Sequence, residues 1–294
     1  MSVKERLVFI YDKHYKQLMI IPVVLLVLAL AQISYQVATT GTFVNLGVSL
    51  KGGSVITVLQ PIDIPQLQAD LTKEFPVFSP TVRGILDSNV IIGATIESAA
   101  QKDDDIKQVI TYLQGTGVHN DAITLEITGA TLGQQFFHQT IRAMIIAFAL
   151  MALVVFLYFR TFVPSIAVVV AAFSDIIETI AVFNLLGMSL STAGVAALLM
   201  LIGYSVDTDI LLTSRVLKRT EGTVVERTLG AMKTGNTMIF TALIAVVMAL
   251  VFTNSDVIRQ IMVILFIGLL ADIINTWIQN AGFLRLYMEK KHAS

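Results

Sequence analysis

The chain has 294 residues, of which 55% are hydrophobic and 14% are charged, and its mean hydropathy is +0.77. This composition excludes an ordinary soluble domain and is typical of an integral membrane protein. The formal net charge of -1 gives no reason to expect a nucleic-acid partner, and a sequence without cysteine has neither disulfide bonds nor cysteine-ligated metal.

Six apolar segments are long enough to cross a bilayer, for which roughly 20 residues span about 30 Å of hydrocarbon. The first follows a mostly polar stretch and lacks a small-residue cleavage pattern, so we expect an uncleaved anchor. The last is long enough to tilt in the membrane. The expected segments are residues 18–34, 141–159, 163–186, 190–212, 238–252 and 258–286, the last five lying within residues 141–286.

Basic residues are distributed unevenly between the two sides of these segments. If the N-terminus is cytoplasmic, the basic clusters at residues 4–16, 215–233 and 285–291 all lie on the cytoplasmic side. The positive-inside rule favours this arrangement. We therefore expect a multi-pass protein of the cell membrane with cytoplasmic termini at residues 1–17 and 287–294.

The cytoplasmic loop expected at residues 215–233 has a pattern of its own. Basic and apolar positions alternate along residues 218–233. Such a pattern is typical of an amphipathic helix that lies in the membrane interface. We therefore predict a separate helix here, in contact with the membrane lipid of the inner leaflet.

Residues 35–138 include about one hundred residues of soluble composition and form the expected extracytoplasmic domain. Alternating β-branched residues, turn residues and helix starts predict the order β-α-β-β-α-β. This order is the split ferredoxin-like motif, a small α+β fold. The expected strands are residues 55–59, 81–86, 90–95 and 122–128, and the expected helices are residues 64–74 and 103–113.

This domain carries no recognisable catalytic constellation. The acidic run at residues 103–105 suits the first turn of a helix better than a metal site. The chain has no phosphate loop, no nucleophile paired with a base and no metal-ligand spacing. We therefore expect neither an enzyme nor a cofactor.

Acidic residues lie inside the membrane-length segments. Asp175 and Glu178 are one helical turn apart, and Asp272 falls near the middle of the sixth segment. A carboxylate at this depth costs a few kcal/mol or more, so it must face the helix bundle, water or a partner. Such residues either carry protons or orient helices as polar contacts. Asp209 points to a different side from Asp207, and we assign it to the cytoplasmic interface. The proton-relay candidates are Asp175, Asp207, Asp272, Glu178 and Arg215.

Three stretches together resemble the SecD/SecF family of protein-export membrane proteins. Residues 47–53 resemble its Gly-x-Asp-Phe-x-Gly-Gly element, with Ser49 in place of the Asp. Ser174 and Asp175 stand where the family has a His-Asp pair. Residues 196–215 resemble the long motif of the fourth SecF helix. The match covers essentially the whole chain, and its departures resemble those of archaeal SecF. The residues that match the family motifs are Gly52, Gly53, Gly203, Tyr204 and Ser205.

The resemblance implies an α-helical membrane protein of six transmembrane helices, one half of a resistance-nodulation-division (RND) type transporter, with one ferredoxin-like outer domain. It implies a heterodimer with SecD that associates with the SecY translocon. It also implies a role in exporting an unfolded substrate polypeptide, coupled to the proton-motive force. Two alternatives remain: an RND-like exporter half for small molecules or lipids, and a non-conducting structural subunit.

Overall fold

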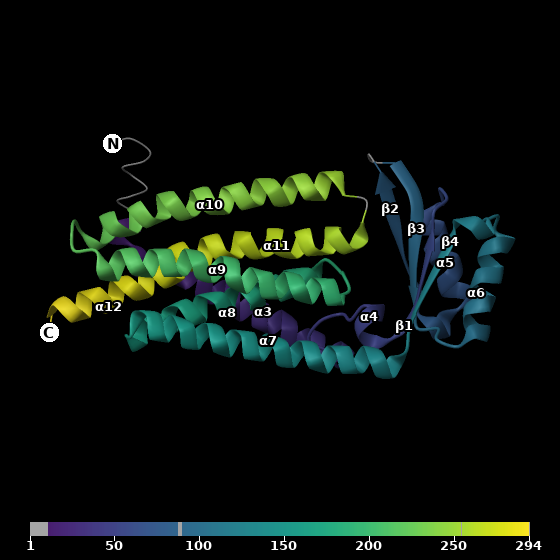
Figure 1. Ribbon diagram of the computed structural model, residues 1–294, viewed down its shortest axis with the longest axis horizontal. Coiled ribbons are helices and arrows are strands. Elements are labelled where there is room, and N and C mark those ends of the chain that lie inside the picture. The colour runs from purple at the N-terminus through teal and green to yellow at the C-terminus, as the bar shows by residue number, and fades with distance from the viewer. Residues whose placement is uncertain (1–10, 88–89, 254, 294) are drawn as a thin grey trace.

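The computed structural model describes residues 11–87, 90–253 and 255–293. It is an elongated molecule with a helical bundle at one end and an α+β domain at the other (Figure 1). Among the described residues, six helices are long and apolar enough to cross a membrane, which confirms the predicted fold class. These spans run over Tyr15–Thr40, Ala130–Phe159, Phe162–Leu185, Thr192–Lys218, Val224–Phe252 and Asp256–Lys291.

The bundle is organised around one central helix. Helix α8 (Phe162–Leu185) contacts α3 (Ile20–Thr40), α7 (Ala130–Phe159), α9 (Thr192–Lys218) and α11 (Asp256–Ile274). Most of α8 is buried, whereas α3, α7 and α10 expose apolar side chains over much of their length. In a bilayer these apolar faces contact lipid, so α8 is the helix best shielded from it.

The turn between α9 and α10 (Val224–Phe252) is shorter than the sequence pattern predicts. Helix α9 continues to Lys218, and α10 begins after Thr223 with a capping box. In that box Thr223 Oγ1 accepts from the Glu226 amide, and the Glu226 carboxylate accepts from the Thr223 amide. The prediction of a separate amphipathic helix at residues 218–233 is therefore wrong, because most of that stretch forms the first turns of α10.

The sixth span is long, as expected, but it is not one regular helix. After α11 the chain forms a π-helical segment, η3 (Asn275–Asn280), and then continues as α12 (Ala281–Ala293). Its far end lies at the end of the bundle remote from the α+β domain (Figure 1). Trp277 packs as a buried residue against Gly235, where an added Cβ would lie 2.4 Å from the indole ring. Trp277 is therefore a packing residue between the sixth span and α10.

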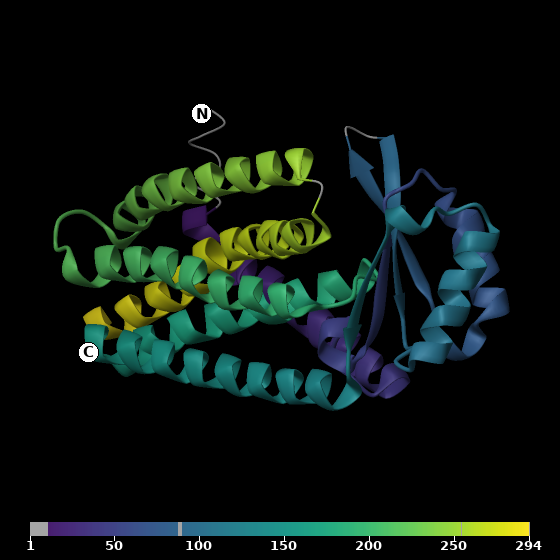
Figure 2. The ribbon, with the colours of Figure 1, turned by 45° about the vertical axis from the view of Figure 1, so that its right-hand side comes forward.

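The α+β domain, which we call the outer domain because it lies beyond the end of the bundle, has the predicted β-α-β-β-α-β order. Its antiparallel sheet has the strand order β2-β3-β1-β4, and α5 and α6 cover the face turned away from the bundle (Figure 2). Apolar residues that alternate along the strands, such as Ile56, Val58 and Ile96, form the core with Leu71 and Leu113 of the two helices. The elements are β1 (Gly53–Val58), α5 (Ile64–Glu74), η1 (Pro76–Phe78), β2 (Thr81–Asp87), β3 (Val90–Ser98), α6 (Asp103–Gly115), η2 (Asn120–Ala122) and β4 (Ile123–Thr128).

The two connections between the domain and the bundle meet at one place. The short helix α4 (Val48–Lys51) leads into β1 through Gly52 and Gly53, and β4 leads into α7. Helix α7 begins at Ala130, so residues 130–138 belong to this helix and not to the globular part of the outer domain. A Cβ on Gly52 would lie 2.5 Å from Ala130 Cα, and one on Gly133 would lie 2.6 Å from the Gly52 amide nitrogen. Glycine at these positions permits the close backbone approach.

Candidate functional site: a buried acid cluster and an outer cavity

Four acidic side chains converge inside the bundle and form what we call the buried acid cluster. Asp175 and Glu178 come from α8, Asp209 from α9 and Asp272 from α11. Asp175, Asp209 and Asp272 have no exposed surface, and Glu178 is 7% exposed. The expectation that Asp209 belongs to the cytoplasmic interface is therefore wrong. Buried carboxyl groups are stable only when they are paired, hydrogen-bonded or neutral.

Uncharged donors hold Asp175 in place from two sides. Ser205 Oγ of α9 lies 2.5 Å from Asp175 Oδ2, and Asn275 Nδ2 lies 2.8 Å from Asp175 Oδ1. The same Asn275 amide is 3.0 Å from Glu178 Oε2. Asn275 therefore connects the two acids of α8, and the family-motif residue Ser205 contacts Asp175, one of the proton-relay candidates.

A single hydroxyl bridges Asp209 and Asp272. Thr276 Oγ1 lies 3.0 Å from Asp209 Oδ1 and 2.8 Å from Asp272 Oδ1. A hydroxyl has one proton to donate, so both contacts can be hydrogen bonds only if one carboxyl group is protonated and donates to the threonine. Thr208 Oγ1 also lies 3.1 Å from Asp272 Oδ2, and Asn280 Nδ2 lies 2.7 Å from Asp209 Oδ1. This geometry accommodates a proton shared between the two acids.

The π-helical segment η3 supplies most of these donors. Asn275 reaches the acids of α8, Gln279 hydrogen-bonds Ser174 of α8, and Thr276 and Asn280 reach Asp209 of α9. A π-helix accommodates an extra residue, so it brings polar side chains from neighbouring turns onto one side of the helix. Such segments are frequent at functional sites. The sequence predicts no irregularity here, because the π-helical geometry goes with contacts to α8 and α9 that a local pattern does not reveal.

Asp207 and Arg215 lie outside the buried acid cluster. Asp207 is exposed on α9, where it lines an open groove of about 600 Å³ between α9 and α10. Arg215 hydrogen-bonds across to α10, with Nη1 2.5 Å from the Gly230 carbonyl and Nη2 2.9 Å from Thr234 Oγ1. Of the five proton-relay candidates, the structure therefore brings together Asp175, Glu178 and Asp272.

The donor set of the cluster is uncharged, and this limits its chemistry. The hydroxyl and amide groups that contact the acids can orient a proton between carboxyl oxygens but do not neutralise them as a cation would. Glu178 Oε1 and Asp209 Oδ2 are buried without a hydrogen-bond partner. In the described ranges, no group of three or more His, Cys, Asp or Glu side chains is arranged to hold a metal ion. The arrangement is suited to taking up, sharing and releasing protons.

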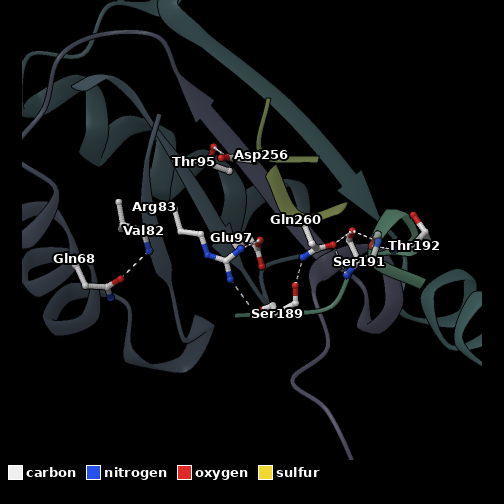
Figure 3. Close-up of polar contacts among 12 residues, drawn as sticks. Gln68, Val82, Arg83, Thr95, Glu97, Ser189, Ser191, Thr192, Asp256 and Gln260 are labelled. Carbon is white, nitrogen blue, oxygen red and sulfur yellow. Dashed lines mark hydrogen bonds and ion pairs between the residues drawn. The ribbon is translucent and has the colours of Figure 1, made fainter. Parts of the chain in front are cut away.

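A second feature is a polar cavity of about 470 Å³ between the open face of the sheet and the adjacent helix ends. Arg83 lies in the cavity wall, with Nη1 3.3 Å from Glu97 Oε1 and Nη2 2.9 Å from Ser189 Oγ beyond α8 (Figure 3). Thr95 Oγ1 lies 2.9 Å from Asp256 Oδ2 at the start of α11. We call these two contacts, Arg83 to Ser189 and Thr95 to Asp256, the docking contacts.

The membrane side of this cavity is held together by Gln260 of α11. Its Nε2 lies 2.5 Å from the Ser189 carbonyl, and its Oε1 accepts from the Ser191 amide at 3.1 Å and from the Ser191 hydroxyl (Figure 3). Ser191 is also the N-cap residue of α9. The turn between α8 and α9 is therefore a fixed surface on which the outer domain rests.

Comparison with known proteins agrees with this architecture. The family model described as protein export membrane protein SecD/SecF, C-terminal, matches residues 108–290. SecF of Pyrococcus furiosus is 42% identical over 98% of this chain and 96% of its own length, and SecF of Methanolacinia petrolearia is 41% identical over 96% and 98%. The crystal structure of SecDF from Thermus thermophilus, described as translocon-associated, has a TM-score of 0.74 at 17% identity. It is matched over 94% of this chain and 38% of that one.

Six membrane-length helices around buried acids, with one ferredoxin-like domain, define a multi-pass membrane protein with the SecDF fold. The family match and the identity to the archaeal relatives are more specific. The chain belongs to the SecF family of SecD/SecF protein-export membrane proteins.

Proposed function

We propose that the chain is the SecF subunit of a SecD–SecF complex that assists the export of unfolded polypeptides through the SecY translocon, driven by the proton-motive force. The buried acid cluster is the observation that carries the proton coupling. Carboxyl groups at this depth are costly, and the shared Thr276 hydroxyl requires a proton between Asp209 and Asp272 if both contacts are hydrogen bonds. The names of the relatives support the role in export.

The same proposal places the α+β domain outside the cell and both termini in the cytoplasm. The turns after α7 and α9 and the helix α12 lie at the bundle end remote from the domain (Figure 1). These segments carry basic residues, including Arg160, Arg219 and Lys290. The positive-inside rule supports assigning that end to the cytoplasm.

A photo-crosslinking experiment in growing cells tests the export role. Photoreactive residues at Val77 and Val90 of the outer domain, which are 83% and 63% exposed, are expected to capture an exporting polypeptide. A proton uncoupler is expected to change the yield at least threefold, because movement of the substrate depends on the proton gradient. The measurement is the crosslinked product on a denaturing gel.

The matched control is a photoreactive residue at Tyr35 of α3, which is 70% exposed but lies in a membrane-length helix. Equal capture there and on the domain would contradict substrate contact. Co-purification without SecD and SecY, together with transport of a small solute, would instead support the exporter alternative.

A disulfide across a docking contact tests whether the outer domain must leave its resting position. Thr95 and Asp256 are both short side chains whose oxygens are 2.9 Å apart, and the chain has no native cysteine. The double substitution T95C/D256C is expected to crosslink under oxidation and to slow export at least fivefold. A reductant is expected to restore the rate.

Each single substitution serves as a control, because it removes the same hydrogen bond without forming the link. If the oxidised double variant exports at the rate of the single variants, domain movement away from the bundle is not required.

A further inference from the structure

An apolar groove of about 520 Å³ lies between α3, α8 and α11, and it borders the buried acid cluster at Glu178. It opens on a surface where Leu28, Leu185 and Leu270 are 60%, 74% and 43% exposed, and such a surface contacts lipid. Its volume falls within the range of small-molecule sites, which is about 300–1,000 Å³. The walls are almost entirely aliphatic and aromatic.

Two polar side chains, Gln32 of α3 and Glu178 of α8, interrupt this apolar lining. Glu178 lines the groove and is 7% exposed. Its Oε2 accepts a hydrogen bond from Asn275, whereas its Oε1 is buried with no partner. The terminal torsion of a glutamate is broad, so the carboxyl group can reorient at the wall of the groove.

The unpaired oxygen restricts what can occupy the groove. A lipid chain or an apolar helix would leave Oε1 without a hydrogen-bond donor, which is unfavourable for a buried polar atom. A water molecule would find only Gln32 and Glu178 as polar side chains among these walls, which is at the low end of what a buried water needs. The favourable occupant therefore combines an apolar body with one hydrogen-bond donor, and a positive charge complements the carboxylate.

We propose that this groove is a binding site for a lipophilic amine dissolved in the membrane, whose protonated nitrogen pairs with Glu178 while its apolar part lies between Leu28, Val182 and Leu270. Glu178 precedes the end of α8 at Leu185 by seven residues, which is about 10 Å along the helix axis. That depth favours a small amphiphile over the headgroup of a phospholipid. The site shares Glu178 with the buried acid cluster, but the argument for amine binding does not rest on the proposed export function.

Photoaffinity labelling tests the site directly. The protein, alone and purified with its SecD partner, is placed in phosphatidylcholine nanodiscs with a diazirine-bearing dodecylamine, and the labelled peptides are mapped by mass spectrometry. Labels are expected on α3, α8 and α11 around the groove. A methyl-terminated probe of the same length reports simple partitioning and is expected to label at least fivefold less.

Three variants separate specific binding from partitioning. Glu178→Gln removes the charge, and Val182→Trp fills the mouth of the groove at a position that is 40% exposed. Each is expected to reduce amine labelling about tenfold. Asp207→Asn, an exposed acid on α9, is expected to leave it within twofold. Val182→Trp is an independent test if Glu178→Gln does not fold.

Three outcomes would overturn the proposal. The first is equal amine labelling of wild type and Val182→Trp. The second is labelling that spreads evenly over the exposed apolar faces of α7 and α10. The third is loss of all groove labelling once SecD is bound, which would show that a partner helix is the occupant.

Discussion

Replacing Asp175 with asparagine is expected to abolish proton-driven export while the protein still folds and assembles. Asparagine has nearly the same volume, and its oxygen can still accept from Asn275 Nδ2 while its amide donates to Ser205 Oγ, which accepts as well as donates. An amide cannot take up or release a proton in place of the carboxyl group. The part of the export rate that depends on the proton-motive force is expected to fall at least tenfold. The rate is measured in inverted membrane vesicles or in whole cells, with and without an uncoupler.

The structure also predicts which neighbour should behave in the same way. Asp209→Asn is expected to match Asp175→Asn, because Asp209 shares the Thr276 hydroxyl with Asp272. Asp104→Asn, at an exposed position in the first turn of α6, controls for loss of an acid as such. Normal uncoupler-sensitive export by Asp175→Asn, at normal protein abundance, would refute the relay role.

Replacing Gly52 with alanine is expected to loosen the outer domain from the bundle. Gly52 has φ of +84° and ψ of 159°, a backbone conformation that is essentially restricted to glycine. The new Cβ would lie 2.5 Å from Ala130 Cα and 2.7 Å from its amide nitrogen, and both are backbone atoms with little freedom to move. Backbone strain and atomic overlap together are expected to lower the free energy of unfolding by about 3 kcal/mol or more. Thermal unfolding and limited proteolysis near residues 51–53 measure the effect.

Gly41 provides a matched control. It has φ of +76° at the end of α3, but a Cβ there would meet no atom within 4 Å. Gly41→Ala therefore tests backbone strain without overlap, and it is expected to lower the free energy of unfolding by about 1–2 kcal/mol. If the two alanine variants unfold at the same temperature, overlap between the new Cβ and Ala130 contributes nothing to the destabilisation of Gly52→Ala.

The outer domain is predictable from sequence because its signals are local. Alternation within strands and the acidic start of α6 depend on neighbours in the chain, so all four strands and both helices occur where they are predicted, within a few residues. The turn between α9 and α10 has a local signal as well, since Thr223 and Glu226 have the spacing of a capping box. The alternation of basic and apolar residues beyond Lys218 predicts a separate interfacial helix instead, and it hides the start of a helix that is continuous with the fifth span.

The acid cluster is predictable only in part. The sequence shows directly that acids lie in membrane-length segments. It does not show which of two acids faces inward, because that depends on how the helix is rotated in the bundle. Asp207 and Asp209 differ by about 200° around α9, and burial selects Asp209. The spacing of Ser205, Asp209, Leu212 and Val216, all buried, could have indicated the inward face. The π-helical segment depends on tertiary contacts that no local pattern fixes.

The placement of the outer domain has a mechanical consequence. Its two covalent connections meet beside Gly52 and Ala130, at the β1 and β4 side of the sheet, whereas Arg83 and Thr95 hold the β2 and β3 side. Neighbouring strands are about 4.8 Å apart, so the attachment of β1 and the contact on β2 are separated by roughly 10 Å. The domain is therefore attached covalently along one edge of its sheet and held by hydrogen bonds along the other edge. Breaking the two docking contacts would remove hydrogen bonds that oppose rotation about the β1 and β4 attachment, and such a rotation would displace the β2 edge most.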